Sequence, residues 1–378
     1  MNFKKIFEIA ILKNASDVHL IHGFPPIIRI DGELFGLEVP AYKIFPLSSA
    51  QSFRSENVLE SGKLLSEDSI SGKKIINVEF LKETLEEILT KEQLKIFLEE
   101  KDYDFGYQID DYRFRVNISY ERNNLKLVAR TISHKRPNLR DIDMPEQVTN
   151  LLKLKQGLIL VTGPTGCGKS TSLAAMINYI NDNRNCNIVT FEDPIEFVFK
   201  SNKSIITQRQ LWTDMNSFAS GLKHVLRQDP NVIMVGEMRD LETISTVITL
   251  AETGHLVLAT LHTRNAPQTI DRIIDIFPPH QQNQIKSQLS LILSAVVSQV
   301  LIPKKGGGRV AVREIMINNT AISNLIRDQK ISQIKNVIET HSTEGMMSFE
   351  RSLKSLYERD LVTEEDARKF LNNRIIFG

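Results

Sequence analysis

The stretch GPTGCGKST, from Gly163 to Thr171, limits the possible folds of this chain more than any other part of its sequence. It matches the pattern GxxxxGK[ST] at every fixed position, and it lies between a strand-like run, GLILVT, and a helix-like run, SLAAMINYIN. In that context glycines let the loop turn its backbone N–H groups toward a polyphosphate, and the helix N-terminus adds a positive dipole. The pattern therefore predicts a P-loop that binds a nucleoside triphosphate.

Two side chains of this loop have a specific expected role. Lys169 is expected to reach the β- and γ-phosphates, and the Ser170 hydroxyl is expected to ligate Mg²⁺. The predicted cofactors are therefore ATP and Mg²⁺. The predicted nucleotide-binding residues of the loop are Gly163, Pro164, Thr165, Gly166, Cys167, Gly168, Lys169, Ser170 and Thr171.

Carboxylates that follow two other apolar runs are candidates for the rest of the site. Glu192 follows NIVTF, with Asp193 and Glu196 just beyond it, and Glu237 follows VIMVG. In a parallel sheet such positions meet at the carboxyl edge, beside the P-loop. Carboxylates at strand ends also cap helices, but next to a P-loop we expect Glu192 and Glu237 to serve Mg²⁺ and the attacking water.

Two histidines, His255 and His262, bracket the run LVLATL. They are seven residues apart, so on one continuous strand their side chains point to opposite faces, and a shared metal ion is not expected. His262 lies at the carboxyl end, where it could sense the γ-phosphate. His255 lies at the start of the run, where contact with nucleotide and a core or interface role fit about equally well.

The pattern of strands and helices divides the chain into an N-terminal α+β domain (1–132), a linker (133–145) and an α/β domain (146–378). The first domain alternates β-rich runs with two expected helices, an amphipathic one at the start of the chain and a second at Thr84–Glu100, and with a polar surface excursion at 48–78. The second alternates short apolar runs with helices, which is typical of a parallel sheet, and residues from about 319 to 378 read as a helical subdomain. The strands expected in the two domains are Asp17–Ile21, Ile27–Ile30, Glu33–Leu37, Tyr103–Ile109, Tyr112–Tyr120, Leu125–Thr131, Gly157–Thr162, Asn187–Phe191, Val232–Gly236, Leu256–Leu261 and Arg309–Ile317.

Composition excludes several other classes of protein. Lys and Arg (47) balance Asp and Glu (46), which disfavours direct nucleic-acid binding, and two cysteines cannot form a four-cysteine zinc site. The most apolar window, Leu289–Ile302, is too short to cross a bilayer. We expect a cytoplasmic chain without membrane insertion.

Four blocks together resemble the secretion ATPases of type II secretion and type IV pili. They are GPTGCGKST, VTFEDPIEF, DPNVIMVGEMRDLETI and AETGHLVLATLHT, and the wider likeness runs from SDVHL to GMMSFERSL. VGEMRDLETI and AISNLIRDQK are most similar to the branch that powers pilus retraction and twitching motility. Ser323 stands where that branch usually has Arg, and Cys167 replaces a commoner Ser; we interpret the cysteine as a silent exchange rather than an acidified thiol.

The resemblance implies a homohexamer in which a PAS-like N-terminal domain is joined to a RecA-like ATPase domain. ATP would lie between subunits, and hydrolysis would drive domain rotations that act on an inner-membrane platform protein, with the motor docked at the cytoplasmic face. Arginines from the N-terminal domain would complete the site, at positions that match Arg115 and Arg130, with Arg113 a weaker match. Glu192 would be the base for water and Glu237 would help to hold Mg²⁺, although these roles could be exchanged.

Two alternatives to an autonomous retraction motor stay open. One is an accessory retraction ATPase that depends on a paralogous partner motor. The other is a hexameric scaffold that binds ATP with little turnover, which the intact Lys169, Ser170, Glu192 and Glu237 disfavour.

Overall fold

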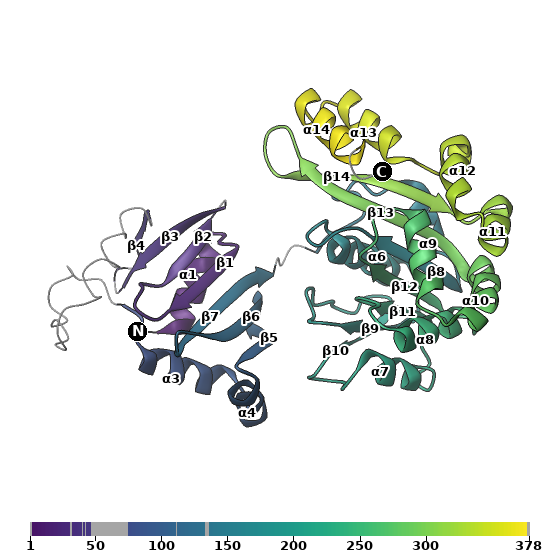
Figure 1. Ribbon diagram of the computed structural model, residues 1–378. Helices are drawn as coiled ribbons and strands as arrows, with labels where there is room; N and C mark the ends of the chain where they lie inside the picture. Colours follow the sequence, from purple (N-terminus) through teal and green to yellow (C-terminus); the bar gives the residue numbers. More distant parts are fainter. Residues whose placement is uncertain are drawn as a thin grey trace. The chain divides into compact units, whose positions relative to one another are not determined.

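The computed structural model describes residues 2–30, 32–39, 41, 43–46, 75–110, 112–132 and 136–375. The chain forms two compact units, Met1–Lys135 and Arg136–Gly378, both drawn in Figure 1. The surface excursion expected at 48–78 lies almost wholly outside the described residues.

The first unit contains a seven-stranded antiparallel sheet in the order β4-β3-β2-β1-β7-β6-β5, with helices packed on one face (Figure 1). Its elements are α1 (Phe3–Leu12), β1 (Asp17–Ile21), β2 (Ile27–Ile30), β3 (Glu33–Glu38), β4 (Lys43–Pro46), α3 (Val78–Ile88), α4 (Lys91–Glu100), β5 (Asp102–Ile109), β6 (Tyr112–Glu121) and β7 (Asn124–Ile132). Strand β6 shows why the sheet has two different faces. Phe114 and Val116 are buried in a core with Phe7 of α1 and Leu85 of α3, while Arg115 between them lies on the opposite face.

The single helix expected at Thr84–Glu100 is wrong, because the chain breaks at Leu89 into α3 and α4. Leu89 is extended (φ −105°, ψ 146°), and Thr90 starts α4 with a capping box in which it exchanges hydrogen bonds with Gln93. Thr84, the expected cap, lies inside α3 and donates its hydroxyl to Phe80 O. The sequence TKEQ carried this capping signal.

The second unit contains a seven-stranded sheet in the order β10-β9-β11-β12-β8-β13-β14, parallel except for β14 at one edge (Figure 1). Its strands are β8 (Gly157–Thr162), β9 (Asn187–Glu192), β10 (Ile205–Gln210), β11 (Val232–Val235), β12 (Leu256–Leu261), β13 (Leu293–Pro303) and β14 (Arg309–Ile317). Its helices are α5 (Glu146–Leu151), α6 (Lys169–Asn183), α7 (Phe218–Val225), α8 (Leu241–Glu252), α9 (Ala266–Asp275), α10 (Pro279–Ile292), α11 (Thr320–Arg327), α12 (Ile334–Thr340), α13 (Phe349–Glu358) and α14 (Glu364–Ile375). The predicted α/β fold class is confirmed, and β10 and β13 are strands that the sequence pattern did not reveal.

Both faces of the parallel sheet are covered by helices, which explains why its central strands are continuous apolar runs. Strands β8, β11 and β12 are buried at every position. One core lies between the sheet and α7 to α12, and a second lies on the face that α6 covers. The expected C-terminal helices α11 to α14 follow β14, as predicted.

Most of the segment expected as a linker, 133–145, packs on the second unit. Leu139 and Met144 are buried in its core, and Asn178 of α6 donates a hydrogen bond to Pro137 O. Arg313 of β14, only 3% exposed, donates to the carbonyl oxygens of Ile142 and Asp143. The boundary between the compact units therefore falls at Lys135/Arg136.

None of the helices that the structure describes is both long and apolar enough to cross a membrane.

Candidate nucleotide-binding site

The P-loop joins the carboxyl end of β8 to the amino end of α6, as the motif requires. Gly163, Gly166 and Gly168 have φ values of 144°, 77° and 86°, which side chains other than glycine rarely adopt. The loop therefore curls tightly before Lys169 begins a 15-residue helix. A loop and helix N-terminus of this kind present backbone N–H groups to an anion, so the residues present fit a polyphosphate.

The order of the strands places the other predicted groups in a row along the same edge of the sheet. Strand β12 lies between β8 and β11, and β9 lies beyond β11. Lys169 follows β8, His262 follows β12, Glu237 lies two residues past β11, and Glu192 ends β9. Four residues that are far apart in sequence therefore belong to one edge of one sheet.

Three of these side chains are in direct contact. Lys169 Nζ lies 3.4 Å from His262 Nδ1, and His262 Nε2 lies 3.0 Å from Glu237 Oε1. An ammonium group can only donate, so Nδ1 is the acceptor in the contact with Lys169, and Nε2 is the ring nitrogen that faces Glu237. His262 therefore connects the lysine expected to bind phosphate with the carboxylate expected near Mg²⁺.

Charge and burial compete at Glu237 and Lys169. Burial favours the neutral acid at Glu237, but the hydrogen bond and charge of Arg239, 2.9 Å away, bring its pKa below the ordinary value. Burial lowers the pKa of Lys169, against the attraction of nearby acidic groups. Lys169 Nζ also donates to Gly163 O (2.8 Å) and Pro164 O (3.1 Å). Glu237 is thus held ionised, as a metal-binding carboxylate must be.

Glu192 has a different environment from Glu237. It is 7% exposed, and its Oε1 accepts hydrogen bonds from Thr190 Oγ1 (2.6 Å) and Gln208 Nε2 (2.9 Å). Burial outweighs these hydrogen bonds and raises its pKa to about 7. A carboxylate whose pKa lies near neutrality suits a general base better than a metal ligand.

The edge of the sheet beside the P-loop offers oxygen donors of the kind that Mg²⁺ prefers. Among the residues that the structure describes there is no cluster of three or more His, Cys, Asp or Glu side chains suited to a metal. Mg²⁺ in nucleotide sites is usually held by one or two protein oxygens together with phosphates and water. The Ser170 hydroxyl and the Glu237 carboxylate are suitable donors.

The predicted arginines lie in the first unit, in one row across its sheet. Strand pairing aligns Arg29 with Asp17, Asp17 with Arg130, and Arg130 with Arg115 on the face opposite the core. Arg130 Nε contacts Asp17 Oδ1 at 3.0 Å although its side chain is 72% exposed, and Arg115 contacts Asp104 at 3.4 Å. The row thus presents three guanidinium groups, only partly neutralised by Asp17 and Asp104.

The structure does not bring His255 to the P-loop. It precedes β12 at the amino edge of the sheet, and its Nδ1 lies 3.0 Å from Leu250 O and 3.2 Å from Thr253 Oγ1 at the end of α8. Its contacts are those of a residue that caps a helix.

Cys167 is buried within the loop, and burial raises the pKa of its thiol despite the nearby Lys169. This agrees with the interpretation of a silent exchange. Ser323 turns inward and donates to Ser290 O at 2.8 Å, so that it joins α11 to α10.

Sequence reasoning missed several residues that contact this site, and one of them is Thr190, which donates a hydrogen bond to Glu192. Arg239 pairs with Glu237, Gln208 hydrogen-bonds Glu192, and Gln299 contacts the P-loop. Gln299 stands in the middle of an apolar run, where an isolated amide is unusual. An amide at that position was the signal in the sequence that could have revealed a buried polar contact.

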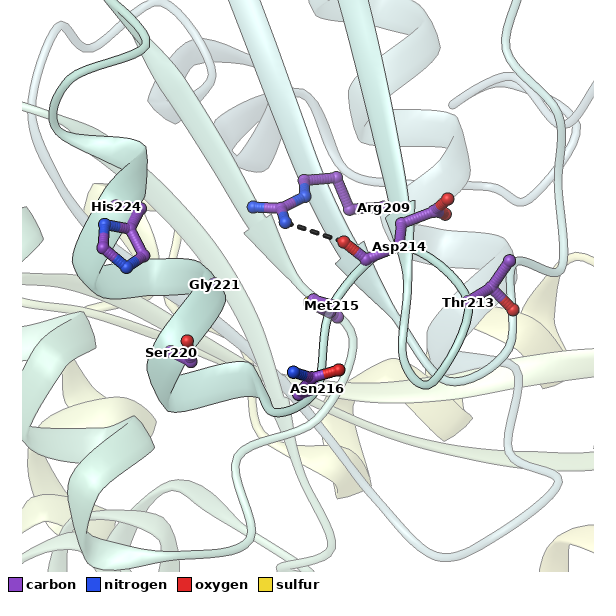
Figure 2. Close-up of a pocket in the computed structure, with 8 residues that line it drawn as sticks. All are labelled: Arg209, Thr213, Asp214, Met215, Asn216, Ser220, Gly221 and His224. Atoms are coloured by element: carbon purple, nitrogen blue, oxygen red, sulfur yellow. Dashed lines mark hydrogen bonds between the residues drawn. The ribbon is translucent and has the colours of Figure 1, made fainter. Parts of the chain in front are cut away.

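A pocket of about 310 Å³ lies elsewhere, where the carboxyl end of β10 faces α7 (Figure 2). Figure 2 shows Arg209 bound to the Asp214 carbonyl oxygen (2.8 Å), with Ser220 and His224 on α7 across the pocket. Arg209 also lies over the Phe191 ring. None of the predicted site residues lines this pocket.

The fold and the site define a P-loop NTPase whose predicted catalytic groups lie along one edge of a parallel sheet. The family model described as "Type II/IV secretion system protein" matches residues 108–307. The chain is 39% identical over 370 residues to the type IV pilus retraction ATPase PilT of Pseudomonas aeruginosa, covering 98% of both chains. It therefore belongs to the type II/IV secretion ATPase family, as the motifs indicated.

Two further comparisons bear on the branch of the family. A crystal structure of the pilus retraction motor PilT with bound ADP matches 98% of this chain and 96% of that one, with a TM-score of 0.82 and 39% identity. The type IV pilus ATPase PilU of Pseudomonas aeruginosa is 36% identical over 369 residues, covering 97% of this chain and 88% of PilU.

Proposed function

We propose that this protein is a Mg²⁺-dependent ATPase motor that powers type IV pilus retraction and twitching motility. The observation that carries the proposal is the row of Lys169, His262, Glu237 and Glu192 along one edge of the sheet, beside an intact P-loop. A scaffold with low turnover has no need for this complete set. The similarity to PilT over 98% of the chain supports the biological role.

Each residue of the row beside the P-loop has a distinct task in hydrolysis. The loop N–H groups and Lys169 would hold the phosphates, and Ser170 with Glu237 would hold Mg²⁺, which would neutralise charge on the phosphates. Glu192 orients the attacking water and accepts its proton. His262 connects Lys169 with Glu237 through its two ring nitrogens.

The arginine row of the first unit (Arg29, Arg115 and Arg130) is a further source of positive charge for the site. Arg115 and Arg130 would stabilise the charge that develops on the transferred phosphoryl group. We propose that this happens at a composite site in a homohexamer, where nucleotide binding and hydrolysis rotate the units against each other. The rotation would act on an inner-membrane platform protein from the cytoplasmic face.

The similarity to PilU favours a second candidate function, an accessory retraction ATPase. Such a protein would hydrolyse ATP but would retract pili only together with a paralogous motor. Twitching assays in a strain that lacks every other retraction ATPase separate the two: an autonomous motor restores motility, whereas an accessory ATPase does not.

The direct test of the site is ATP hydrolysis and nucleotide binding by Lys169→Ala. Loss of the phosphate-binding ammonium should abolish turnover, while Lys203→Ala, an exposed lysine of the same unit, should hydrolyse ATP like wild type. Normal turnover in Lys169→Ala would contradict the site assignment.

A further inference from the structure

Gln299 contacts the P-loop from a neighbouring strand that the ATPase motifs do not include. Strand β13 pairs in parallel with β8, with Ser298 aligned with Thr162. Gln299 is therefore level with Gly163, the first residue beyond β8. It is 1% exposed, so its amide group must find its hydrogen bonds inside the protein.

The side-chain amide of Gln299 forms hydrogen bonds both with the loop and with the helix that follows it. Its Nε2 donates to Cys167 O at 2.7 Å, and its Oε1 accepts from Ser172 Oγ at 2.8 Å. One buried side chain thus holds the bend of the loop and the first turn of α6.

The backbone of Gln299 lies against the start of the loop as well. A Cβ added at Gly163 would lie 2.3 Å from Gln299 O, and one added at Gly168 would lie 3.3 Å from Gln299 Nε2. Two glycines of the motif are therefore pressed against this residue, and Gln299 contacts the loop at its entry, its bend and its exit.

The bond to Cys167 O has a consequence for phosphate binding. In a trans peptide the C=O and the N–H point in opposite directions. A carbonyl of Cys167 that is anchored toward β13 therefore turns the N–H of Gly168 away from β13, toward the open side of the loop. We infer that Gln299 is a positioning residue that holds the P-loop in its phosphate-binding shape before nucleotide arrives.

This inference rests on the proposed nucleotide site, and its test uses variants that remove one contact or both. Gln299→Glu keeps the size of the side chain and the acceptor for Ser172, and its ionised carboxylate has no donor for Cys167 O. Gln299→Met removes both hydrogen bonds whatever the protonation state. Ser172→Ala removes only the other contact. Ser298→Ala is the matched control, because Ser298 is the adjacent buried residue and bonds Thr162 rather than the loop.

Affinity for Mg·ADP, measured with a fluorescent ADP analogue on the full-length protein, is the main readout. We expect Gln299→Glu to weaken binding by about tenfold or more and Ser172→Ala by about threefold, with Ser298→Ala unchanged. KM for ATP should rise while kcat changes little, because the loop holds ground state and transition state alike.

The thiol of Cys167 reports the shape of the loop independently of nucleotide. In a Cys186→Ser background it is the remaining cysteine, and it is buried against Gly163 in the loop. A thiol reagent should modify it faster in Gln299→Glu than in wild type, and bound ADP should slow the reaction.

Several outcomes would overturn the inference. Wild-type affinity and a protected thiol in both Gln299→Glu and Gln299→Met would show that the contact does not shape the loop, and equal losses in Ser298→Ala would show only general packing. If Gln299→Glu does not fold, the ADP affinity and the thiol reactivity of Gln299→Met test the inference in the same way. Lys169→Ala in this assay separates the two claims, because unchanged binding there refutes the nucleotide site itself.

Discussion

At the scale of single residues, two glutamates on one sheet edge are given opposite properties by their surroundings. Arg239 keeps Glu237 ionised, whereas burial raises the pKa of Glu192 to about 7. Sequence alone left their roles interchangeable. The structural contrast favours Glu192 as the base and Glu237 as the metal ligand.

The raised pKa predicts an acidic limb in the pH dependence of kcat/KM. A base must be unprotonated to act, so the rate should fall by about tenfold per pH unit below the pKa of Glu192. Thr190→Val removes a hydrogen bond to the carboxylate, which raises this pKa further and moves the limb to higher pH. Thr207→Val, exposed on the adjacent strand, should leave the profile unchanged.

Glu192 should also cost stability at high pH. Its pKa is higher in the folded state than in the unfolded chain, so its contribution is most favourable below about pH 4.5 and is lost as pH rises through 7. Glu192→Gln keeps the acceptor for Thr190 and Gln208 but carries no charge. We expect this inactive variant to melt at a higher temperature than wild type at pH 8 to 9, with little difference at pH 5.

An equal melting temperature for the two proteins across this pH range would show that Glu192 is not held in an environment that disfavours its charge.

At the scale of elements, the apolar runs of the parallel sheet could be read from sequence because strands buried on both faces leave a continuous pattern. Strand β10 was not predicted because its pattern is mostly polar. Strand β13 was not predicted because α10 continues directly into it, so that the two form one apolar stretch in the sequence. The break between α3 and α4 was missed because apolar spacing continues across Leu89. The contact of Gln299 with the P-loop depends on β13 and could not be foreseen without it.

The segment before α5 gives a prediction about elements. Buried Arg313 satisfies two carbonyl oxygens of this segment, and burial lowers its pKa to about 10. Arg313→Met should cost about 2–4 kcal/mol in urea unfolding, because those carbonyls lose their partner. Arg359→Met removes a half-exposed ion pair with Asp143 from the same segment and should cost less than about 1 kcal/mol. Equal losses would show that Arg313 does not anchor the segment.

At the scale of the whole molecule, the groups that the account requires are divided between two units. Lys169, His262, Glu237 and Glu192 belong to the second unit, and the arginine row belongs to the first. The sequence motifs could predict the P-loop edge because its spacing is local to each strand end. The role of Arg115 and Arg130 came from family resemblance, because no local pattern joins residues on separate units.

Turnover per subunit as a function of protein concentration, for wild type, Arg130→Ala and Arg122→Ala, tests whether the arginine row completes the ATPase site in the assembled protein. Arg122 is an exposed residue of the β6–β7 turn, outside the arginine row, and serves as the control. The account predicts that wild type and Arg122→Ala gain activity per subunit as the protein assembles, whereas Arg130→Ala stays at least about tenfold lower at every concentration. A rate per subunit that does not depend on concentration, together with full activity in Arg130→Ala, would contradict it.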